Sequence, residues 1–132
     1  TRVSGWIAAH ARADEVAARR RMNWFWLDSK LKTVPGYRNA HPHLDAGTSP
    51  LSLTVVVRDR SRLLHRLYSR GIEPYVFGQW AHPVMDALAF PDTEGLRAHL
   101  LCMPVHQGLT PSQLERLADI LASFLPEHEF EP

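Results

Sequence analysis

Residues 98–125, with the sequence AHLLCMPVHQGLTPSQLERLADILASFL, decide the fold that we expect for this chain. The apolar residues 100–103 predict a buried strand. Pro104 ends this strand, and the segment 105–108 has the composition of a turn. A strand, a turn and a helix are therefore expected to follow one another directly.

The helix after this turn has an explicit start signal. Thr110 is the expected N-cap, and Gln113 three residues later gives the pair the spacing of a capping box. Pro111 suits the first helical turn, where its missing N–H costs nothing. Beyond the cap, leucines recur at helical spacing while polar residues occupy the opposite side. The helix is therefore predicted to cover an apolar surface.

Length and composition indicate one ordinary globular domain. The chain has 132 residues, of which 45% are hydrophobic and 22% are charged, and its formal net charge is +1. This charge is too small to argue for nucleic acid or an anionic membrane as a partner, and no apolar run is long enough to span a bilayer. The single Cys102 falls in a predicted strand, so no disulfide is expected and a cytoplasmic location is predicted.

A long helix is predicted at the N-terminal end. From Ser4 to about Leu31 nothing breaks a helix after Gly5, and such a helix is about 40 Å long. A compact domain of this size has a radius of gyration of only roughly 14 Å. We therefore expect the second half to pack on this domain and the first half to lie against a neighbour outside the chain. A helix that kinks near Asp14 and folds back is the alternative. The start at Thr1, without an initiator Met, also suggests either a cut piece of a longer protein or a processed protein.

The middle of the chain predicts two more strands joined by a helix. Residues 51–57 are rich in β-branched side chains and form the clearest strand. Asp59 is the expected N-cap of a helix over 60–70, and Gly71 is its left-handed C-terminal residue. Residues 72–77 predict a second strand, in which Pro74 favours an edge position or an irregular start.

These elements predict an α+β fold in which two or three helices cover one face of a small three-stranded sheet. The segment 79–99 is expected to be a loop with one or two short helical turns. The single domain 1–132 is therefore divided into a linking helix (1–32), a turn-rich loop (33–50), a sheet and helix core (51–125) and an acidic, frayed tail (126–132).

Two histidines in the turn-rich loop resemble part of a metal site. His41 and His43 flank Pro42, and Asp45 follows two residues later. Zinc needs three or four converging ligands, whereas Pro42 favours an extended backbone that points the two imidazoles apart. A solvated loop is the better interpretation, and no metal ligand is predicted.

The string LLCMPVHQGLTPSQLERLADIL resembles the C-terminal end of the DegT/StrS family of aminotransferases, which are fold type I enzymes that use pyridoxal phosphate and often act on nucleotide-linked keto-sugars. The resemblance covers nearly the whole chain, and its parts occur in the right order. Further similar segments are RRRMNW at 19–24, the strand and cap at 49–60, RGIEP at 70–74, Trp80 to Pro83, and Phe90-Pro91.

This resemblance implies that the chain is the C-terminal small domain of a pyridoxal-phosphate-dependent aminotransferase. The implied partners are a missing large catalytic domain and a second copy in a homodimer, and the implied reaction is amino transfer to a keto-sugar or related carbonyl compound. In this family the large domain supplies the Schiff-base lysine. The two lysines of this chain, Lys30 and Lys32, lie at the polar end of a predicted helix and are not assigned to catalysis. No cofactor is expected on this segment alone.

The resemblance also implies that loops at the strand ends contact the substrate. Trp80 and His82 after the second strand and His106 after the third are the candidate substrate-binding residues. Trp80 is suited to stack on a sugar or base ring, and His106 to hydrogen-bond a hydroxyl or phosphate. A loop anchor and a turn residue are the structural alternatives for Trp80 and His106. The alternative for the whole chain is a stand-alone small-molecule or protein-binding module without catalytic activity.

Overall fold

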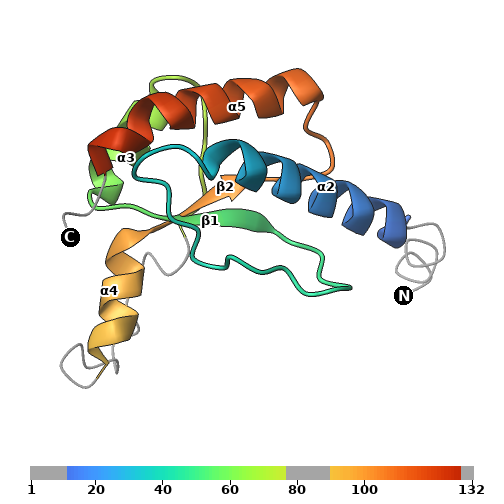
Figure 1. The fold of residues 1–132 in the computed structure, drawn as a ribbon, viewed down its shortest axis with the longest axis horizontal. Helices are drawn as coiled ribbons and strands as arrows, with labels where there is room; N and C mark the ends of the chain where they lie inside the picture. Colours follow the sequence, from blue (N-terminus) through green and yellow to red (C-terminus); the bar gives the residue numbers. More distant parts are fainter. Residues whose placement is uncertain (1–11, 77–89, 129–132) are drawn as a thin grey trace, which may run out of the picture.

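The computed structural model describes residues 12–76 and 90–128, which form an α+β fold as predicted (Figure 1). No helix in these two ranges is long and apolar enough to cross a membrane. In chain order the elements are α2 (Ala13–Leu31), β1 (Ser52–Val56), α3 (Arg60–Tyr68), α4 (Pro91–His99), β2 (Leu100–Pro104), α5 (Pro111–Phe124) and the short 3-10 helix η1 (Leu125–His128).

The centre of the fold is an antiparallel pair of strands, β1 and β2. Leu53 lies opposite Met103 and Val55 opposite Leu101, and all four side chains are fully buried. Residues at alternate positions of a strand point to the same face of a sheet. This alternation therefore gives the sheet one apolar face, which packs against the helices.

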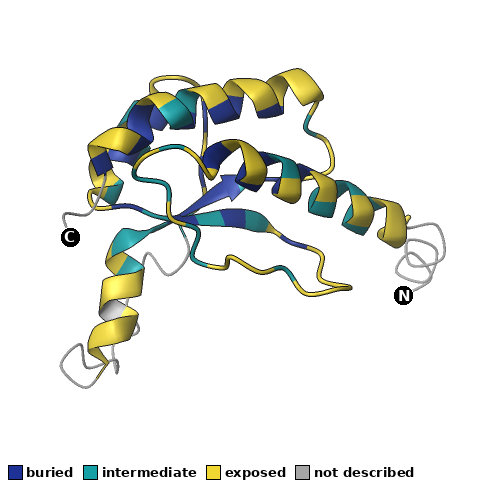
Figure 2. Cartoon of the chain, in the orientation of Figure 1, coloured by how far each residue is buried: buried dark blue, intermediate teal, exposed yellow. Residues whose placement is uncertain are grey.

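Helices α2, α3 and α5 cover that face. Figure 1 shows α5 and α2 side by side above the strands, and Figure 2 shows their buried residues turned inward. Helix α4 projects away from this layer and is mostly exposed. The apolar residues of α2, α3 and α5 that complete the core are Trp24, Leu27, Leu31, Leu63, Leu67, Leu117, Ala118, Leu121 and Phe124.

The third strand expected over 72–77 is wrong for the part that the structure describes. Only Tyr75 pairs with the sheet, through a bridge to Cys102 in which each N–H donates to the other carbonyl at 2.8 and 2.9 Å. Pro74, next to Tyr75, has no N–H to offer a sheet ladder, so pairing does not extend through it. A second isolated bridge, Asn39 to Val55, lies on the other side of β1.

The predicted start and end of α3 are confirmed in their capping residues. The side chain of Asp59 accepts a hydrogen bond from the backbone N–H of Arg62 at 2.9 Å, and Gly71 has a φ of +69°. The helix itself ends at Tyr68, two residues earlier than expected, and the chain turns through 69–71. Helix α2 ends at Leu31 as predicted, while residues 4–11 of the expected long helix lie outside the described residues.

Two expected irregular segments are more ordered than predicted. Residues 91–99 form a nine-residue helix, α4, instead of a loop with short turns; residues 79–89 of that segment lie outside the described range. The tail was expected to fray from residue 126, but η1 continues to His128, which is buried. Its contacts involve residues far away in the sequence, so local composition gives no sign of them.

A buried carboxylate fixes the chain as it leaves α2. Asp28 accepts hydrogen bonds from the Tyr37 hydroxyl at 2.6 Å and from the Asn39 side chain at 2.8 Å. The Lys32 ammonium lies 3.1 Å from its second oxygen. Burial alone would raise the pKa of Asp28, but these hydrogen bonds and the nearby ammonium charge together hold the pKa below its ordinary value of 3.8.

Candidate functional site

The turn after β2 is held in place by the long helix α2. The buried side chain of Asn23 donates hydrogen bonds to the carbonyls of Val105 at 3.3 Å and His106 at 3.0 Å. Three residues earlier, Arg20 donates to the side-chain oxygen of Gln107 at 2.9 Å. These contacts fix the backbone of the turn and leave the imidazole of His106 exposed at its surface.

Two neighbouring hollows meet at His106. The first, of about 380 Å³, lies between the turn and α5, and the second, of about 440 Å³, lies beside β2. Glu73, Pro104 and His106 line both of them. The first is otherwise lined by Gly71, Ile72, Leu109, Gln113, Arg116 and Leu117, and the second by Leu51, Ser52, Tyr75, Cys102 and Met103.

The two hollows differ in chemistry. The first is lined in part by His106, Glu73 and Arg116, whose side chains can hydrogen-bond hydroxyl or phosphate oxygens; the Arg116 guanidinium also donates to the backbone carbonyl of Arg70 at 2.6 Å. The second is mainly apolar and includes the half-exposed ring of Tyr75, which can contact the face of a ring. The region around His106 therefore combines a polar hollow with a mainly apolar one.

Gly108 shapes this region by its lack of a side chain. A Cβ at this position would lie 3.3 Å from Nδ1 of His106 and 3.5 Å from Cε1. A larger residue would therefore crowd the imidazole against the turn.

Of the three predicted substrate-binding residues, the structure describes only His106. His106 lies where the two hollows meet, whereas Trp80 and His82 lie outside the described residues. Neither lysine lines these two hollows: the Lys30 ammonium sits 5.4 Å from the centre of the Trp26 ring, and Lys32 pairs with Asp28.

His41 and His43 line a separate hollow of about 330 Å³ beside β1, together with Asp45. Across residues 12–76 and 90–128, no group of three or more histidine, cysteine or acidic side chains is arranged to hold a metal ion. The loop that carries these histidines is instead anchored by Arg21, which donates to the carbonyls of Asp45 and Thr48 at 2.7 and 2.9 Å.

Glu73 and Arg116 are lining residues that the sequence did not indicate. Glu73 falls in the segment 72–77, where the pattern predicts a strand and gives no sign of a hollow. Arg116 follows Gln113 by three residues and therefore shares its side of the helix. This spacing from the capping residue was the available signal that Arg116 lies near the turn.

The fold is that of part of an aminotransferase. The aminotransferase TlmJ from Streptoalloteichus hindustanus is 27% identical and superposes with a TM-score of 0.70, over 85% of this chain and 32% of that one. The sugar aminotransferase CalS13 from Micromonospora echinospora is 22% identical, with a TM-score of 0.73 over 86% of this chain and 32% of that one. DesV from S. venezuelae, solved in complex with a ketimine intermediate, is 23% identical with a TM-score of 0.71, over 85% of this chain and 32% of that one.

The sequence model of the DegT/DnrJ/EryC1/StrS aminotransferase family matches residues 7–122, and the chain belongs to this family. It spans about a third of the length of the solved aminotransferases named above. No curated protein sequence matches it.

Proposed function

We propose that this chain acts as the C-terminal small domain of a pyridoxal-phosphate-dependent aminotransferase that transfers an amino group to a keto-sugar or a related carbonyl compound. The observation that carries the proposal is the family match over residues 7–122 in a chain that corresponds to about a third of the solved enzymes. The description of CalS13 as a sugar aminotransferase supports the substrate class.

The described residues do not fit the cofactor by themselves. Pyridoxal phosphate needs a lysine amine for its attachment, and it supplies the electron sink for amino transfer when bound. Lys30 packs against Trp26 and Lys32 pairs with buried Asp28, so neither amine faces the hollows at His106. We therefore assign the cofactor to a large domain and derive no step of the reaction through this chain.

The part that we assign to this chain is substrate contact. His106 is exposed in a turn whose backbone is hydrogen-bonded to Asn23 of α2. Its imidazole can donate a hydrogen bond to a substrate hydroxyl or phosphate, or accept one from a substrate hydroxyl. Stacking of Trp80 on a ring and polar contact by His82 remain predictions, as do the homodimer and the cytoplasmic location.

The test of catalytic incompleteness is incubation of the 132-residue chain with pyridoxal phosphate. We expect no stoichiometric absorbance band from bound cofactor after dialysis. A stable band that is lost when Lys30 or Lys32 is replaced by Ala would contradict the proposal.

The coding sequence upstream of Thr1 gives an independent check. We expect it, or a neighbouring gene, to encode a large domain with a Schiff-base lysine. If neither does and the chain binds a small molecule or protein by itself, the alternative of a stand-alone binding module is favoured.

A further inference from the structure

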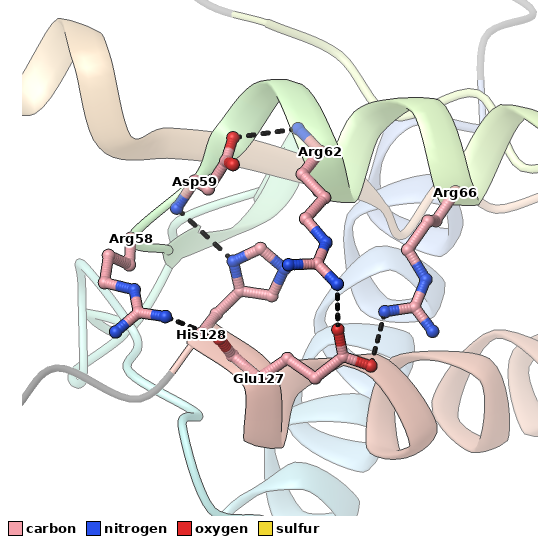
Figure 3. A network of polar contacts seen from close by, with 6 residues as sticks. All are labelled: Arg58, Asp59, Arg62, Arg66, Glu127 and His128. Atoms are coloured by element: carbon pink, nitrogen blue, oxygen red, sulfur yellow. Dashed lines mark hydrogen bonds and ion pairs between the residues drawn. The ribbon is translucent and has the colours of Figure 1, made fainter.

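The last turn of η1, residues 127 and 128, is docked against α3 and the two residues before it by charged groups. Figure 3 shows the Glu127 carboxylate between two arginines of α3, with Arg62 at 2.9 Å and Arg66 at 2.6 Å. The guanidinium of Arg58 donates to the backbone carbonyl of Glu127 at 3.3 Å. Arg58 and Arg62 lie 69 and 65 residues from Glu127 in the sequence, so these contacts form only in the folded protein.

His128 lies at the centre of this contact and is 1% exposed. Its Nδ1 accepts a hydrogen bond from the backbone N–H of Asp59 at 3.3 Å (Figure 3). Because Nδ1 accepts this bond, we assign the ring as neutral with its proton on Nε2. Nε2 is buried without a hydrogen-bond partner among the described residues. The docked ring therefore has no place for a second proton at Nδ1.

Charged groups around the ring act in both directions. Burial lowers the pKa of His128 most strongly; the carboxylates of Asp59 and Glu127 raise it, and the guanidinium groups of Arg62 and Arg58 lower it. The net direction is below the ordinary value of 6.5. Protonation would also turn Nδ1 into a donor that faces the N–H of Asp59, so the charged ring and the docked segment exclude each other.

We propose that His128 makes the C-terminal segment a proton-released latch, in which residues 126–128 separate from α3 in mildly acidic solution while the sheet and its covering helices stay folded. Leu125 belongs to the buried core, so the separation begins after it. The latch goes beyond the proposed function and does not depend on it.

The direction of the pH effect follows from linkage. A histidine whose pKa is lower when docked contributes its full stabilisation above the undocked pKa of about 6.5, and this contribution is lost as the pH falls from there toward the docked pKa. Glu127 keeps its charge in this range, because the hydrogen bond from Arg66 and the charges of Arg66 and Arg62 hold its pKa below its ordinary value of 4.5. Loss of docking near pH 6 is therefore assigned to His128.

Amide hydrogen exchange on the 132-residue chain, read by NMR at about pH 7 and about pH 5.5, tests the latch. The N–H of Asp59 reports directly on the bond to His128. After correction for intrinsic rates, we expect its protection to fall by up to about tenfold between the two pH values, while that of Leu53 in β1 stays unchanged.

The His128→Asn variant keeps an acceptor oxygen near the position of Nδ1 but does not titrate, so its Asp59 protection should not change with pH. His65→Asn, at an exposed position on α3, should keep the wild-type response.

A direct titration of the His128 ring by NMR provides a readout that does not require a variant to fold. A ring that titrates at or above 6.5, or a His128→Asn chain with the wild-type pH response, would overturn the proposal. Simultaneous loss of protection at Leu53 would also overturn it, because the transition would then be global unfolding. Glu127→Gln should weaken docking at both pH values and keep the response to pH; loss of that response would assign the effect to Glu127 and not to His128.

Discussion

At the scale of single residues, Asp28 is the polar group on which the exit from α2 depends. It is 3% exposed and accepts two side-chain hydrogen bonds from Tyr37 and Asn39. Asp28→Asn removes the charge and turns one acceptor into a donor, so we expect the free energy of unfolding to fall by about 1–3 kcal/mol in urea denaturation. Lys32→Met is the matched control: the Lys32 side chain is 66% exposed, and its loss should cost less than about 1 kcal/mol.

The same carboxylate gives a pH signature. Because the pKa of Asp28 is held below 3.8 in the folded chain, its stabilisation is present above that value and is lost as the pH falls through the folded pKa. The difference in urea midpoint between wild type and Asp28→Asn should therefore shrink below about pH 4. Equal costs for Asp28→Asn and Lys32→Met at neutral pH would contradict this account.

His106 carries the prediction about substrate. In the proposed complete enzyme, His106→Ala should raise the KM for the proposed keto-sugar substrate about fivefold, which is the effect of losing one hydrogen bond of about 1 kcal/mol. Steady-state kinetics and the melting temperature together check this, since the exposed imidazole should contribute little to stability. His65→Ala, on α3 and away from both hollows, is the control. An unchanged KM for His106→Ala would leave His106 as a turn residue only.

At the scale of elements, α5 depends on its N-terminal cap. Gln113 N–H donates to the Thr110 hydroxyl at 3.2 Å, and Thr110 N–H donates to the side chain of Gln113 at 2.8 Å. Thr110→Ala should lower the free energy of unfolding by about 1 kcal/mol, whereas Thr110→Asn, which keeps a capping oxygen, should cost much less. Thermal denaturation of the two variants measures the difference, and equal melting temperatures would show that the cap is not needed.

Features that depend on neighbouring residues were predictable from the sequence, whereas features that depend on distant residues were not. The caps at Asp59 and Thr110 and the left-handed Gly71 were predictable because each depends on residues within one helical turn. The expected strand over 72–77 is a single bridge at Tyr75, since β propensity does not reveal how far a neighbouring strand can pair around a proline. Docking of His128 depends on Asp59, 69 residues earlier, and no local pattern encodes it.

The candidate site was predictable to a smaller extent. The sequence predicts that His106 lies in the turn after a strand, and the structure confirms this position after β2. The hollows themselves arise where residues 71–75, β2 and α5 come together, so Glu73 and Arg116 could not be joined to His106 from spacing alone. Whether these residues touch a substrate stays a prediction.

At the scale of the whole molecule, α2 presents an exposed apolar stripe. Met22 and Phe25 are three residues apart on one side of the helix and are 51% and 47% exposed. In the proposed enzyme this stripe would be covered by the large domain or a second copy, so we expect the isolated chain to self-associate through it. Sedimentation should show that Phe25→Glu weakens this association at least about tenfold.

Tyr68 provides the control for this association. It is 51% exposed, like Met22, but it lies on α3. Tyr68→Glu should leave the association constant unchanged. A chain that stays monomeric at high concentration, or an equal effect of both variants, would contradict self-association through α2.

The two isolated bridges have a consequence for how copies of this chain can meet. On the outer side of β1, the N–H of Val56 donates to the Arg38 carbonyl and the N–H of Ala40 donates to the Thr54 carbonyl. On the outer side of β2, the N–H groups of Tyr75 and Cys102 each donate to the carbonyl of the other residue. Irregular chain thus occupies hydrogen-bonding positions that an incoming extended peptide would need on both flanks of the ribbon. An extended peptide could therefore pair with the sheet at these positions only by displacing residues 38–40 from β1 or Tyr75 from β2.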